Sequence, residues 1–473
     1  MLTRAALLID FGSTFTKLRA IDLDRRAILA SGEGPSTVST DIGVGMRHAL
    51  DDLGRRMGTL PTFKYRLGSS SAAGGLRMVT VGLVPELTAE AARRAALGAG
   101  ARLIGTFSYR LTKGDIAHIE RMHPDILLLS GGTDGGNSQF ILHNARTLGL
   151  SAITCPVVYA GNREAWDEAS EFFGTKEVIC TENVMPEFNV LNVEPARDAI
   201  RRIFLQRIVH AKGIDGARSD CDAVLMPTPA AVLEGARLLA DGCGSTSGIG
   251  ELVVLDPGGA TTDVHSIASG APSSPEIAMR GLPEPRVKRT VEGDLGMRHN
   301  ATGIAEVAGV TTLAADADVA PETFMQLVGE LSQDVDRLPT TREEWTVDRA
   351  LARAALRVAM KRHCGTLETI YTALGPVTVQ MGKNLSDIKT VIGTGGVIAH
   401  SRAPTELLSV VAADPTEPQS LRPRAPRFLI DREYLLYACG LLSQVEPEAA
   451  LELALKYLMD PAREAPHDAP TSV

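Results

Sequence analysis

Two stretches of the chain share one pattern, and this repeated pattern restricts the possible folds more than any other feature. The apolar run Leu7–Ile9 leads into Asp10 and Gly12, and the apolar run 252–255 leads into Asp256 and two glycines. Short apolar runs of this kind are typical of buried strands. A glycine just after a strand allows a tight turn with positive φ. The sequence therefore predicts two strand–turn units, each with a carboxylate at the end of its strand.

The residues that follow each carboxylate have the chemistry of an anion-binding turn. Hydroxyls, backbone N–H groups and a lysine can bind phosphate, and an aspartate can hold a hard cation such as Mg²⁺, usually through water. Each stretch alone could also be an ordinary hairpin. Together they predict two halves of a clamp for a magnesium–nucleotide phosphate. The predicted phosphate-binding residues are Gly12, Ser13, Thr14, Thr16 and Lys17 in the first stretch, and Gly258, Gly259, Thr261 and Thr262 in the second.

A third motif lies late in the chain, where the apolar residues 391–392 run into a glycine loop. Glycines without side chains let the backbone lie flat against a ligand. We therefore predict that Gly393, Gly395 and Gly396 support a nucleoside.

The order of these three motifs resembles that of the ATPase superfamily of actin, Hsp70 and the sugar kinases. The resemblance implies an α/β fold with two actin-like ATPase (ribonuclease H-like) domains and a nucleotide cleft between them. It implies that ATP and Mg²⁺ are the cofactors, and that Asp10 and Asp256 position the metal and the attacking water. Lys17 would assist catalysis, and Asp263 would either hold the second loop in shape or bind the metal.

The length of 473 residues is sufficient for two domains. Residues 241–250 are rich in glycine and serine, so we expect an N-terminal domain over 1–246, a C-terminal domain over 247–460 and a flexible tail over 461–473. A glycine-rich loop at 131–137 follows Asp10 at a spacing similar to that between Asp256 and the late glycine loop. This similarity predicts an internal duplication in which the two glycine loops correspond.

Two segments allow alternative interpretations. The serine- and glycine-rich segment 69–75 can bind an anion or form a flexible polar loop. Segment 280–298 is dense in charge and glycine, which is typical of a solvated surface loop. Its alternative is a functional segment in which Glu292 or Asp294 binds metal or orients water as a catalytic group. Residues 321–338 and 347–373 are predicted to be helical.

Composition excludes several functional classes. The net charge of −9 and an aromatic content of 4% argue against a nucleic-acid surface. The six cysteines form no CxxC motif and the ten histidines no HxxxH pair, which is typical of reduced thiols in a cytoplasmic protein. The first apolar run leads straight into Asp10, so we expect no signal peptide, and no apolar run reaches the roughly 20 residues that span a bilayer. We expect no membrane and no nucleic-acid partner.

Longer blocks resemble one family within the superfamily, the MutL (GlmL) accessory proteins of adenosylcobalamin-dependent glutamate mutase, or methylaspartate mutase. The resemblance implies an ATPase-type chaperone that reactivates the mutase by exchanging damaged for intact cobalamin, with the mutase subunits as partners. Pro257 departs from the usual motif, but the N–H groups of Gly258 and Gly259 stay free to donate, so we expect the clamp to keep its function. The blocks are 10–17, 69–79, 82–92, 131–137, 182–187, 191–197, 226–234, 258–266 and 282–298.

Two other functions stay open from the sequence. A small-molecule kinase of the same superfamily would need a carboxylate base beside a substrate pocket, for which Glu292 and Asp294 are the candidates. A nucleotide-sensing scaffold without catalysis would bind ATP without turnover, although both aspartates and both sets of hydroxyls are present. The residues leave open which mutase is the client, whether ATP is preferred over GTP, and the oligomeric state.

Overall fold

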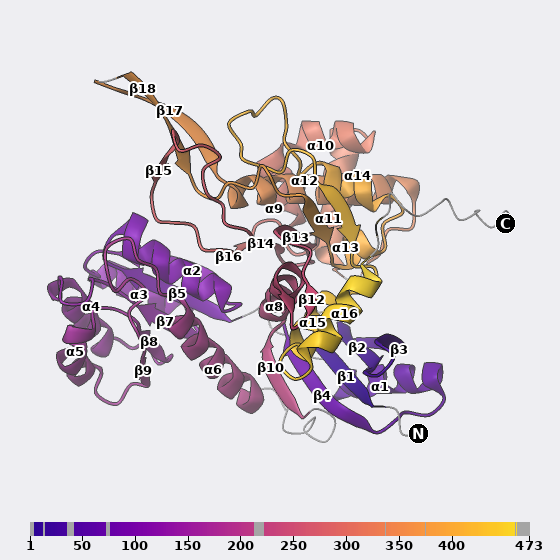
Figure 1. The fold of residues 1–473 in the computed structure, drawn as a ribbon, viewed down its shortest axis with the longest axis horizontal. Helices are drawn as coiled ribbons and strands as arrows, with labels where there is room; N and C mark the ends of the chain where they lie inside the picture. Colours follow the sequence, from indigo (N-terminus) through magenta and orange to yellow (C-terminus); the bar gives the residue numbers. More distant parts are fainter. Residues whose placement is uncertain are drawn as a thin grey trace. The chain divides into compact units, whose positions relative to one another are not determined.

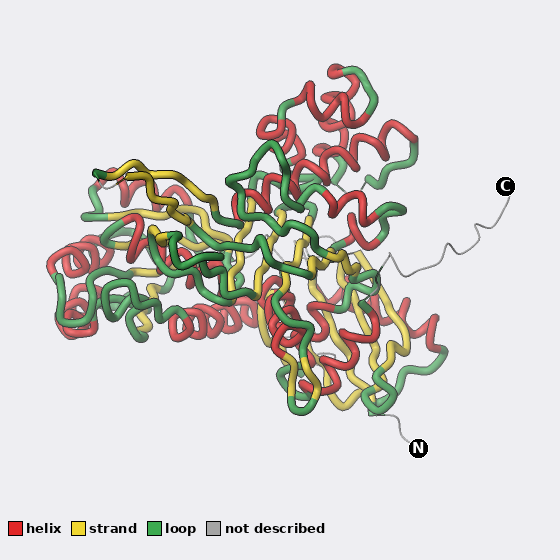
Figure 2. Tube along the Cα trace, turned by 45° about the horizontal axis from the view of Figure 1, so that its top comes forward, coloured by secondary structure: helices red, strands yellow, loops and turns green. Residues whose placement is uncertain are grey.

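The chain forms a mixed α/β protein with two compact units, as predicted. The computed structural model describes residues 4–12, 15–35, 42–71, 76–211, 222–335, 337–373, 375–458 and 460. Helices and strands are both present throughout the described chain (Figure 2). The first unit comprises Met1–Glu234, Arg280–Lys288 and Gly440–Ala449, and the second comprises Gly235–Met279, Arg289–Cys439 and Ala450–Val473.

The first unit contains a five-stranded sheet built around its first strand (Figure 1). Its elements are β1 (Ala5–Phe11), β2 (Phe15–Asp22), β3 (Ala27–Pro35), β4 (Phe63–Ser70), β10 (Ala223–Pro227) and the helix α1 (Ile42–Met57), which packs on β2 and β3. The order is β3-β2-β1-β4-β10, with β2 antiparallel to both neighbours and β4 parallel to β1 and β10. Every residue of β1 is buried, as expected for an apolar run in the centre of a sheet.

Between β4 and β10 the same unit contains a second five-stranded sheet. Its strands are β5 (Arg77–Gly82), β6 (Arg102–Ser108), β7 (Ile126–Leu129), β8 (Val157–Tyr159) and β9 (Val178–Cys180). All are parallel, in the order β6-β5-β7-β8-β9. Its helices are α2 (Glu90–Gly98, preceded by a π-helical turn, Pro85–Ala89), α3 (Lys113–Met122), α4 (Gln139–Gly149), α5 (Trp166–Phe173, after a 3₁₀ turn at Arg163–Ala165) and α6 (Glu194–Ala211).

The second unit repeats the order of the first sheet. Its strands are β13 (Leu252–Pro257), β14 (Thr262–Ile267), β16 (Val287–Glu292), β19 (Thr390–Gly393) and β20 (Arg427–Ile430), in the order β16-β14-β13-β19-β20. β14 is antiparallel to β13, and β19 is parallel to β13 and β20. If the five strands of each sheet are numbered by their order in the sequence, both sheets have the same spatial order: third, second, first, fourth and fifth. This repetition confirms the predicted internal duplication.

The predicted correspondence between the two glycine loops is wrong. The late loop at 393–396 follows β19, the fourth strand of its sheet, whereas the loop at 131–137 follows β7 of the parallel sheet. The fourth strand of the first unit is β4, so the segment beginning at Ser69 is the true counterpart of the late loop. The spacings agree by coincidence, because the parallel sheet is inserted between β4 and β10.

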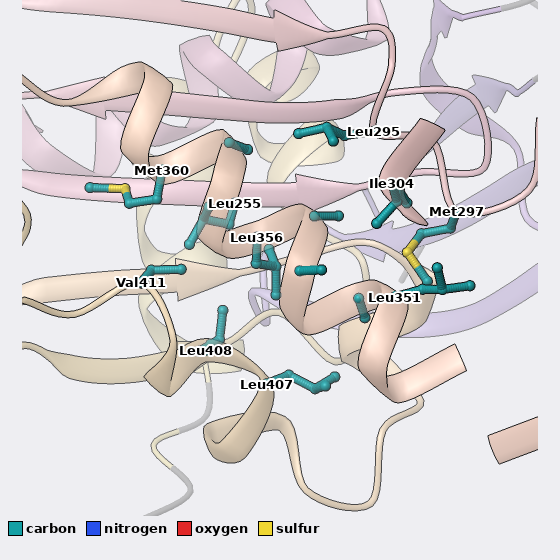
Figure 3. Packing of buried hydrophobic residues seen from close by; sticks show 14 of the residues in the cluster. Leu255, Leu295, Met297, Ile304, Leu351, Leu356, Met360, Leu407, Leu408 and Val411 are labelled. Carbon is teal, nitrogen blue, oxygen red and sulfur yellow. The ribbon is translucent and has the colours of Figure 1, made fainter. Parts of the chain in front are cut away.

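The core of the second unit lies between its sheet and a layer of helices (Figure 3). Leu255 of β13 packs there with Leu351, Leu356 and Met360 of α12 (Arg342–His363). A capping box starts α12, because Thr341 Oγ1 accepts a hydrogen bond from the Glu344 N–H and the Glu344 carboxylate accepts one from the Thr341 N–H. The other helices are α9 (Ala301–Ala308), α10 (Val310–Ala317), α11 (Pro321–Gln333), α13 (Gly396–Ala399) and α14 (Pro404–Ser409).

Two predicted segments differ in the structure. The helix predicted over 347–373 ends at His363, and Thr366–Thr372 forms β17. β17 pairs with β18 (Gly375–Met381), and β18 also pairs with β15 (Ala278–Arg280), which gives a three-stranded sheet. The β-branched and aromatic residues of Thr366–Thr372 favour a strand, which overrides the helical pattern before it. Within the segment predicted as a surface loop, Val287–Glu292 forms β16 and buries Arg289.

Three helices cross from one unit into the other along the chain: α8 (Thr228–Asp241), α15 (Leu436–Leu442) and α16 (Pro447–Tyr457). The short hairpin β11 (Gly242–Cys243) and β12 (Thr246–Ser247) lies in the glycine-rich segment that follows α8. No helix within the described residues is long and apolar enough to cross a bilayer.

A late segment of the chain completes the first unit. The Glu446 carboxylate, between α15 and α16, accepts hydrogen bonds from Arg4 Nη2 at 2.6 Å, Lys64 Nζ at 2.9 Å and the Tyr65 hydroxyl at 3.3 Å. Arg4 precedes β1, and the other two residues lie on β4. Segment 440–449 is therefore bonded to the N-terminal sheet.

Candidate functional site

The turn after β1 places Asp10 and Lys17 on one face of the first sheet. Asp10 lies opposite Lys17 across the two strands, and Phe11 lies opposite Thr16. Because successive residues of a strand point to opposite faces, Thr16 shares the face of Phe11, which belongs to the hydrophobic core. The Gly12 N–H closes the turn by donating to the Phe15 carbonyl at 3.1 Å. The predicted Ser13 and Thr14 lie outside the described residues.

Two hydroxyls that the sequence analysis did not assign to the site hold the buried carboxylate of Asp10. Thr228 Oγ1 donates to Asp10 Oδ1 at 2.6 Å, and Ser69 Oγ lies 3.4 Å from the same oxygen. Burial raises the pKa of Asp10 above its ordinary value, although Lys17, Thr228 and Ser69 oppose this increase. Ser69 comes from the adjacent strand β4 and Thr228 begins α8. The serine-rich segment thus contributes to the site through Ser69.

The turn after β13 in the second unit repeats this geometry. The Gly258 N–H donates to the Thr261 carbonyl at 2.8 Å, as Gly12 does in the first unit. The expectation that Gly258 keeps a free N–H is therefore wrong, because this bond closes the turn. Thr262 is fully buried, and its hydroxyl donates to the Leu295 carbonyl at 2.7 Å. In each turn, one glycine N–H therefore closes the turn and one threonine side chain is directed into the protein interior.

Asp263 stands opposite Asp256, in the place that Lys17 takes in the first unit. Its Oδ1 accepts bonds from Arg289 Nε at 2.7 Å and Nη2 at 2.6 Å, and its Oδ2 accepts a bond from Thr261 Oγ1 at 3.1 Å. Because both oxygens are bonded within the protein, the geometry favours the role of holding the loop in shape over the role of binding metal.

Residues 294–300 hold the second turn from outside the hairpin. The N–H of Met297 donates to the Gly258 carbonyl at 3.0 Å, and the N–H of Arg298 donates to the Gly259 carbonyl at 2.9 Å. The guanidinium of Arg298 also donates to Asp348 of α12 at 2.6 Å. The turn after β13 is therefore linked by one arginine to the long helix of its unit.

Glu292 and Asp294 are both held by one arginine. Arg362 Nη1 lies 2.8 Å from Glu292 Oε2 and 2.7 Å from Asp294 Oδ1, and Nη2 donates to Asp294 Oδ2 at 2.9 Å. The hydrogen bonds from Arg362 lower the pKa of Asp294 below its ordinary value. A carboxylate with a lowered pKa is a weak proton acceptor, so the pairing with Arg362 does not favour Asp294 as a general base.

The glycine loop after β19 contacts the second carboxylate. Gly395 has φ of 85°, and a Cβ at this position would lie 2.5 Å from Asp256 Oδ1. The three predicted glycines have different roles. A Cβ on Gly393 would meet the side chains of Ile398 and Leu408, whereas a Cβ on Gly396 would make only an ordinary contact with His400 Cδ2 at 3.9 Å. Gly393 thus serves core packing, and Gly395 brings the loop against Asp256.

A cavity of about 380 Å³ lies beside this loop in the second unit. Residues from three segments line it, so no single sequence motif identifies it. The side chains are an indole, arginines, carboxylates and small residues, which can stack on and hydrogen-bond a heteroaromatic ring. The lining residues are Arg342, Trp345, Thr346, Asp348, Arg349 and Ala352 of α12, Val397, Ser401, Arg402 and Ala403 after the loop, and Glu406 and Leu407 of α14.

The carboxylates fit a magnesium ion held mostly by water and phosphate. Within the described part of the chain, no cluster of three or more acidic, histidine or cysteine side chains could hold a metal ion. Mg²⁺ keeps several waters and usually takes one or two carboxylates plus the phosphates of a nucleotide. Asp10 is buried among hydroxyls and Asp256 is half-buried beside a glycine loop, so each suits one such contact.

Comparisons with known proteins agree with the sequence resemblance. The family model described as MutL protein matches residues 6–458. Protein MutL of Clostridium tetanomorphum is 47% identical over 461 residues, covering 96% of this chain and 99% of that protein. The similar solved structures include nucleotide-free acetone carboxylase (14% identity, TM-score 0.41, 93% of this chain and 70% of that one) and a glycerol dehydratase reactivase (12% identity, TM-score 0.33, 93% and 99%).

Proposed function

Because this chain belongs to the MutL protein family, we propose that it is a magnesium-dependent ATPase that reactivates an adenosylcobalamin-dependent mutase. The observation that carries the proposal is the repeated strand–turn unit. The strand carries Asp10 just before the turn in one unit and Asp256 in the other. A duplicated carboxylate–glycine turn beside a nucleoside-sized cavity supports nucleotide binding. Membership of the family supports a mutase as the client, with glutamate mutase as the first candidate.

The second unit supplies the nucleoside site in this proposal. The base enters the cavity between α12 and the segment after the glycine loop, where Trp345 and Arg402 present flat surfaces. The backbone at Gly395 lies against the sugar and phosphates, because a side chain there would strike Asp256. The backbone N–H of Gly259 contacts phosphate.

The chain's own groups contribute to hydrolysis by positioning and by charge. Bound Mg²⁺ supplies Lewis-acid stabilisation of the charge that develops on the transferring phosphoryl group. Asp10 and Asp256 hold ordered water, and Lys17 offers a cation on the face of Asp10. Thr228 and Ser69 fix the orientation of the Asp10 carboxylate and favour its ionised form. Catalysis of this kind needs no covalent intermediate on the protein.

Reactivation requires that ATP and ADP states bind the mutase differently, since a nucleotide shifts an equilibrium only by its differential affinity for the two states. In this proposal the ATP state opens the inactivated mutase, and damaged cobalamin leaves. Intact cofactor, whose chemistry is radical-based, then enters the mutase. The hydrolysis step resets the chain.

The test is Mg-ATP hydrolysis by the purified chain, alone and with a glutamate mutase inactivated on its cobalamin, followed by recovery of mutase activity after fresh adenosylcobalamin is added. We expect Asp10→Ala and Asp256→Ala each to abolish turnover, and Glu292→Gln, whose partner is Arg362, to retain it. Wild-type turnover in either aspartate variant would refute the site. Phosphorylation of a metabolite would instead identify a kinase, and tight ATP binding without turnover would identify a nucleotide-sensing scaffold.

A further inference from the structure

One short segment belongs to a different unit from the residues on both sides of it. Residues 280–288, named the strap here, pack with the first unit, whereas residues 235–279 and 289–439 pack with the second. The strap leads directly into β16, whose first two residues are its last two. The chain thus passes from one unit into the other within a single strand.

Buried charges fix the strap to α2 of the parallel sheet. Arg94 donates from Nη1 to the Pro283 carbonyl at 2.6 Å and from Nη2 to Glu284 at 2.9 Å, and its Nε lies 2.8 Å from Glu90 of the same helix. Glu284 also pairs with Lys288 at 2.9 Å. The side chains of Arg94, Glu284 and Lys288 are 8%, 5% and 10% exposed. Moving one partner away would leave a buried charge uncompensated, so this network holds the strap and α2 in one geometry.

Apolar and backbone contacts add to these ion pairs. Leu282 of the strap is buried in the core that also contains α2 and α6 residues. Arg197 of α6 lies with Nη2 3.4 Å from the Val287 carbonyl. Gly98 of α2 leaves room for this arginine, since a Cβ there would lie 2.2 Å from Arg197 Nε. The strap is therefore packed into the parallel sheet's helix layer rather than lying loosely over it.

The next residue of the same strand is bonded to the second phosphate turn. Arg289 follows Lys288 directly, and its Nη2 and Nε lie 2.6 and 2.7 Å from Asp263 Oδ1. Thr290 Oγ1 lies 2.8 Å from His363 Nδ1, which ties the strand to α12 as well. An extended strand hydrogen-bonded to β14 is stiff over three or four residues, so a shift of the turn at Asp263 displaces the strap.

We propose that the strap and β16 couple the nucleotide state of the second phosphate turn to helix α2 of the parallel sheet. This inference rests on the proposed function, because it needs a nucleotide at that turn. The coupling runs through named contacts: Asp263 to Arg289, along the strand to Lys288 and Glu284, and from Glu284 to Arg94. The parallel sheet is then the part of the first unit that reports which nucleotide is bound.

The test is hydrogen–deuterium exchange of the full chain with and without the non-hydrolysable analogue Mg-ADPNP, after calorimetry has shown that the analogue binds. In the wild type we expect exchange in α2 and in the strap to change by at least about fivefold, a typical size for coupling between sites. Glu284→Gln keeps the shape of the side chain but removes its charge, and Arg94→Met removes the other partner. In both variants, the nucleotide-dependent change in hydrogen–deuterium exchange at α2 should fall below about twofold, whereas the change at residues 258–263 should persist.

Arg201→Met serves as the matched control, because Arg201 on α6 pairs with Glu234 at 3.2 Å and lies outside the network. It should keep the wild-type response at α2, and melting curves identify any variant that fails to fold. A response at α2 that survives in Glu284→Gln would overturn the coupling while leaving the ATPase proposal intact, as would a wild type that binds the analogue without any change at α2. Absence of binding would overturn both proposals.

Discussion

Replacement of Thr228 by valine isolates one hydrogen bond of the site and allows its size to be worked out. The Thr228 hydroxyl donates to the buried Asp10 carboxylate at 2.6 Å, and valine has nearly the same shape without the hydroxyl. Hydrogen bonds to charged groups contribute about 1.5–3 kcal/mol. Because this bond favours the ionised carboxylate, its loss should raise the pKa of Asp10 further.

This increase has a sign that an assay can detect. Burial already raises the pKa of Asp10, and Thr228 opposes that increase, so Thr228→Val moves the pKa further upward. If turnover needs the ionised carboxylate, the acidic limb of the profile of kcat against pH should move to higher pH. Thr228→Ser keeps the hydroxyl and should keep the profile.

Superimposable profiles for Thr228→Val and the wild type would refute this reasoning. So would a serine variant as impaired as the valine variant, since both would then suffer from altered packing at the start of α8. Melting curves measured beside the kinetics show whether the valine variant is folded. ATP hydrolysis measured after chelation of Mg²⁺ gives the background rate.

Three further predictions address other parts of the structure. Gly395→Ala should cost about 1–2 kcal/mol of stability and weaken ATP binding, because φ is 85° and a Cβ would strike Asp256, whereas Gly396→Ala should behave as the wild type in melting and calorimetry. Hydrogen bonds lower the pKa of Glu344 from 4.5 to about 2, so its stabilisation is complete above pH 4.5 and is lost as pH falls toward about 2. Glu344→Gln should therefore melt below the wild type at neutral pH, and the gap should close in acid. Trp345→Ala should raise the Kd for ATP at least about tenfold with little change in Tm, because Trp345 is 50% exposed and lines the cavity. An unchanged Kd would contradict the proposed binding of the base in this cavity.

The sequence predicted those parts of the site that lie on a single turn. The apolar run before Asp10 marks a strand, and the glycine after it marks a turn, so the first hairpin and its repeat at Asp256 follow from local rules. Gly395 was assigned to the nucleoside loop by the same local reasoning, and the structure places it against Asp256.

Groups brought in from distant segments could not be predicted in this way. Thr228 is 218 residues from Asp10, and no local pattern joins them. The cavity takes its walls from α12, α14 and the loop after β19. Spacing alone is also a poor guide here, because the inserted parallel sheet places the loop at 131–137 at the distance expected for a duplicate of the late loop. Arg289, the partner of Asp263, lies in a segment whose many charged residues predict a surface loop, although the segment forms a partly buried strand.

The bonds of Glu446 have a consequence for the order in which the chain is made. Its partners Arg4, Lys64 and Tyr65 leave the ribosome 442, 382 and 381 residues before Glu446 does. Domains generally fold as units, the N-terminal one first, while synthesis continues. Here the first sheet must wait until segment 440–449 has been made before this partner arrives. A nascent chain that has not reached residue 440 therefore carries an unfinished first unit, and a truncation before that residue damages the unit that contains β1.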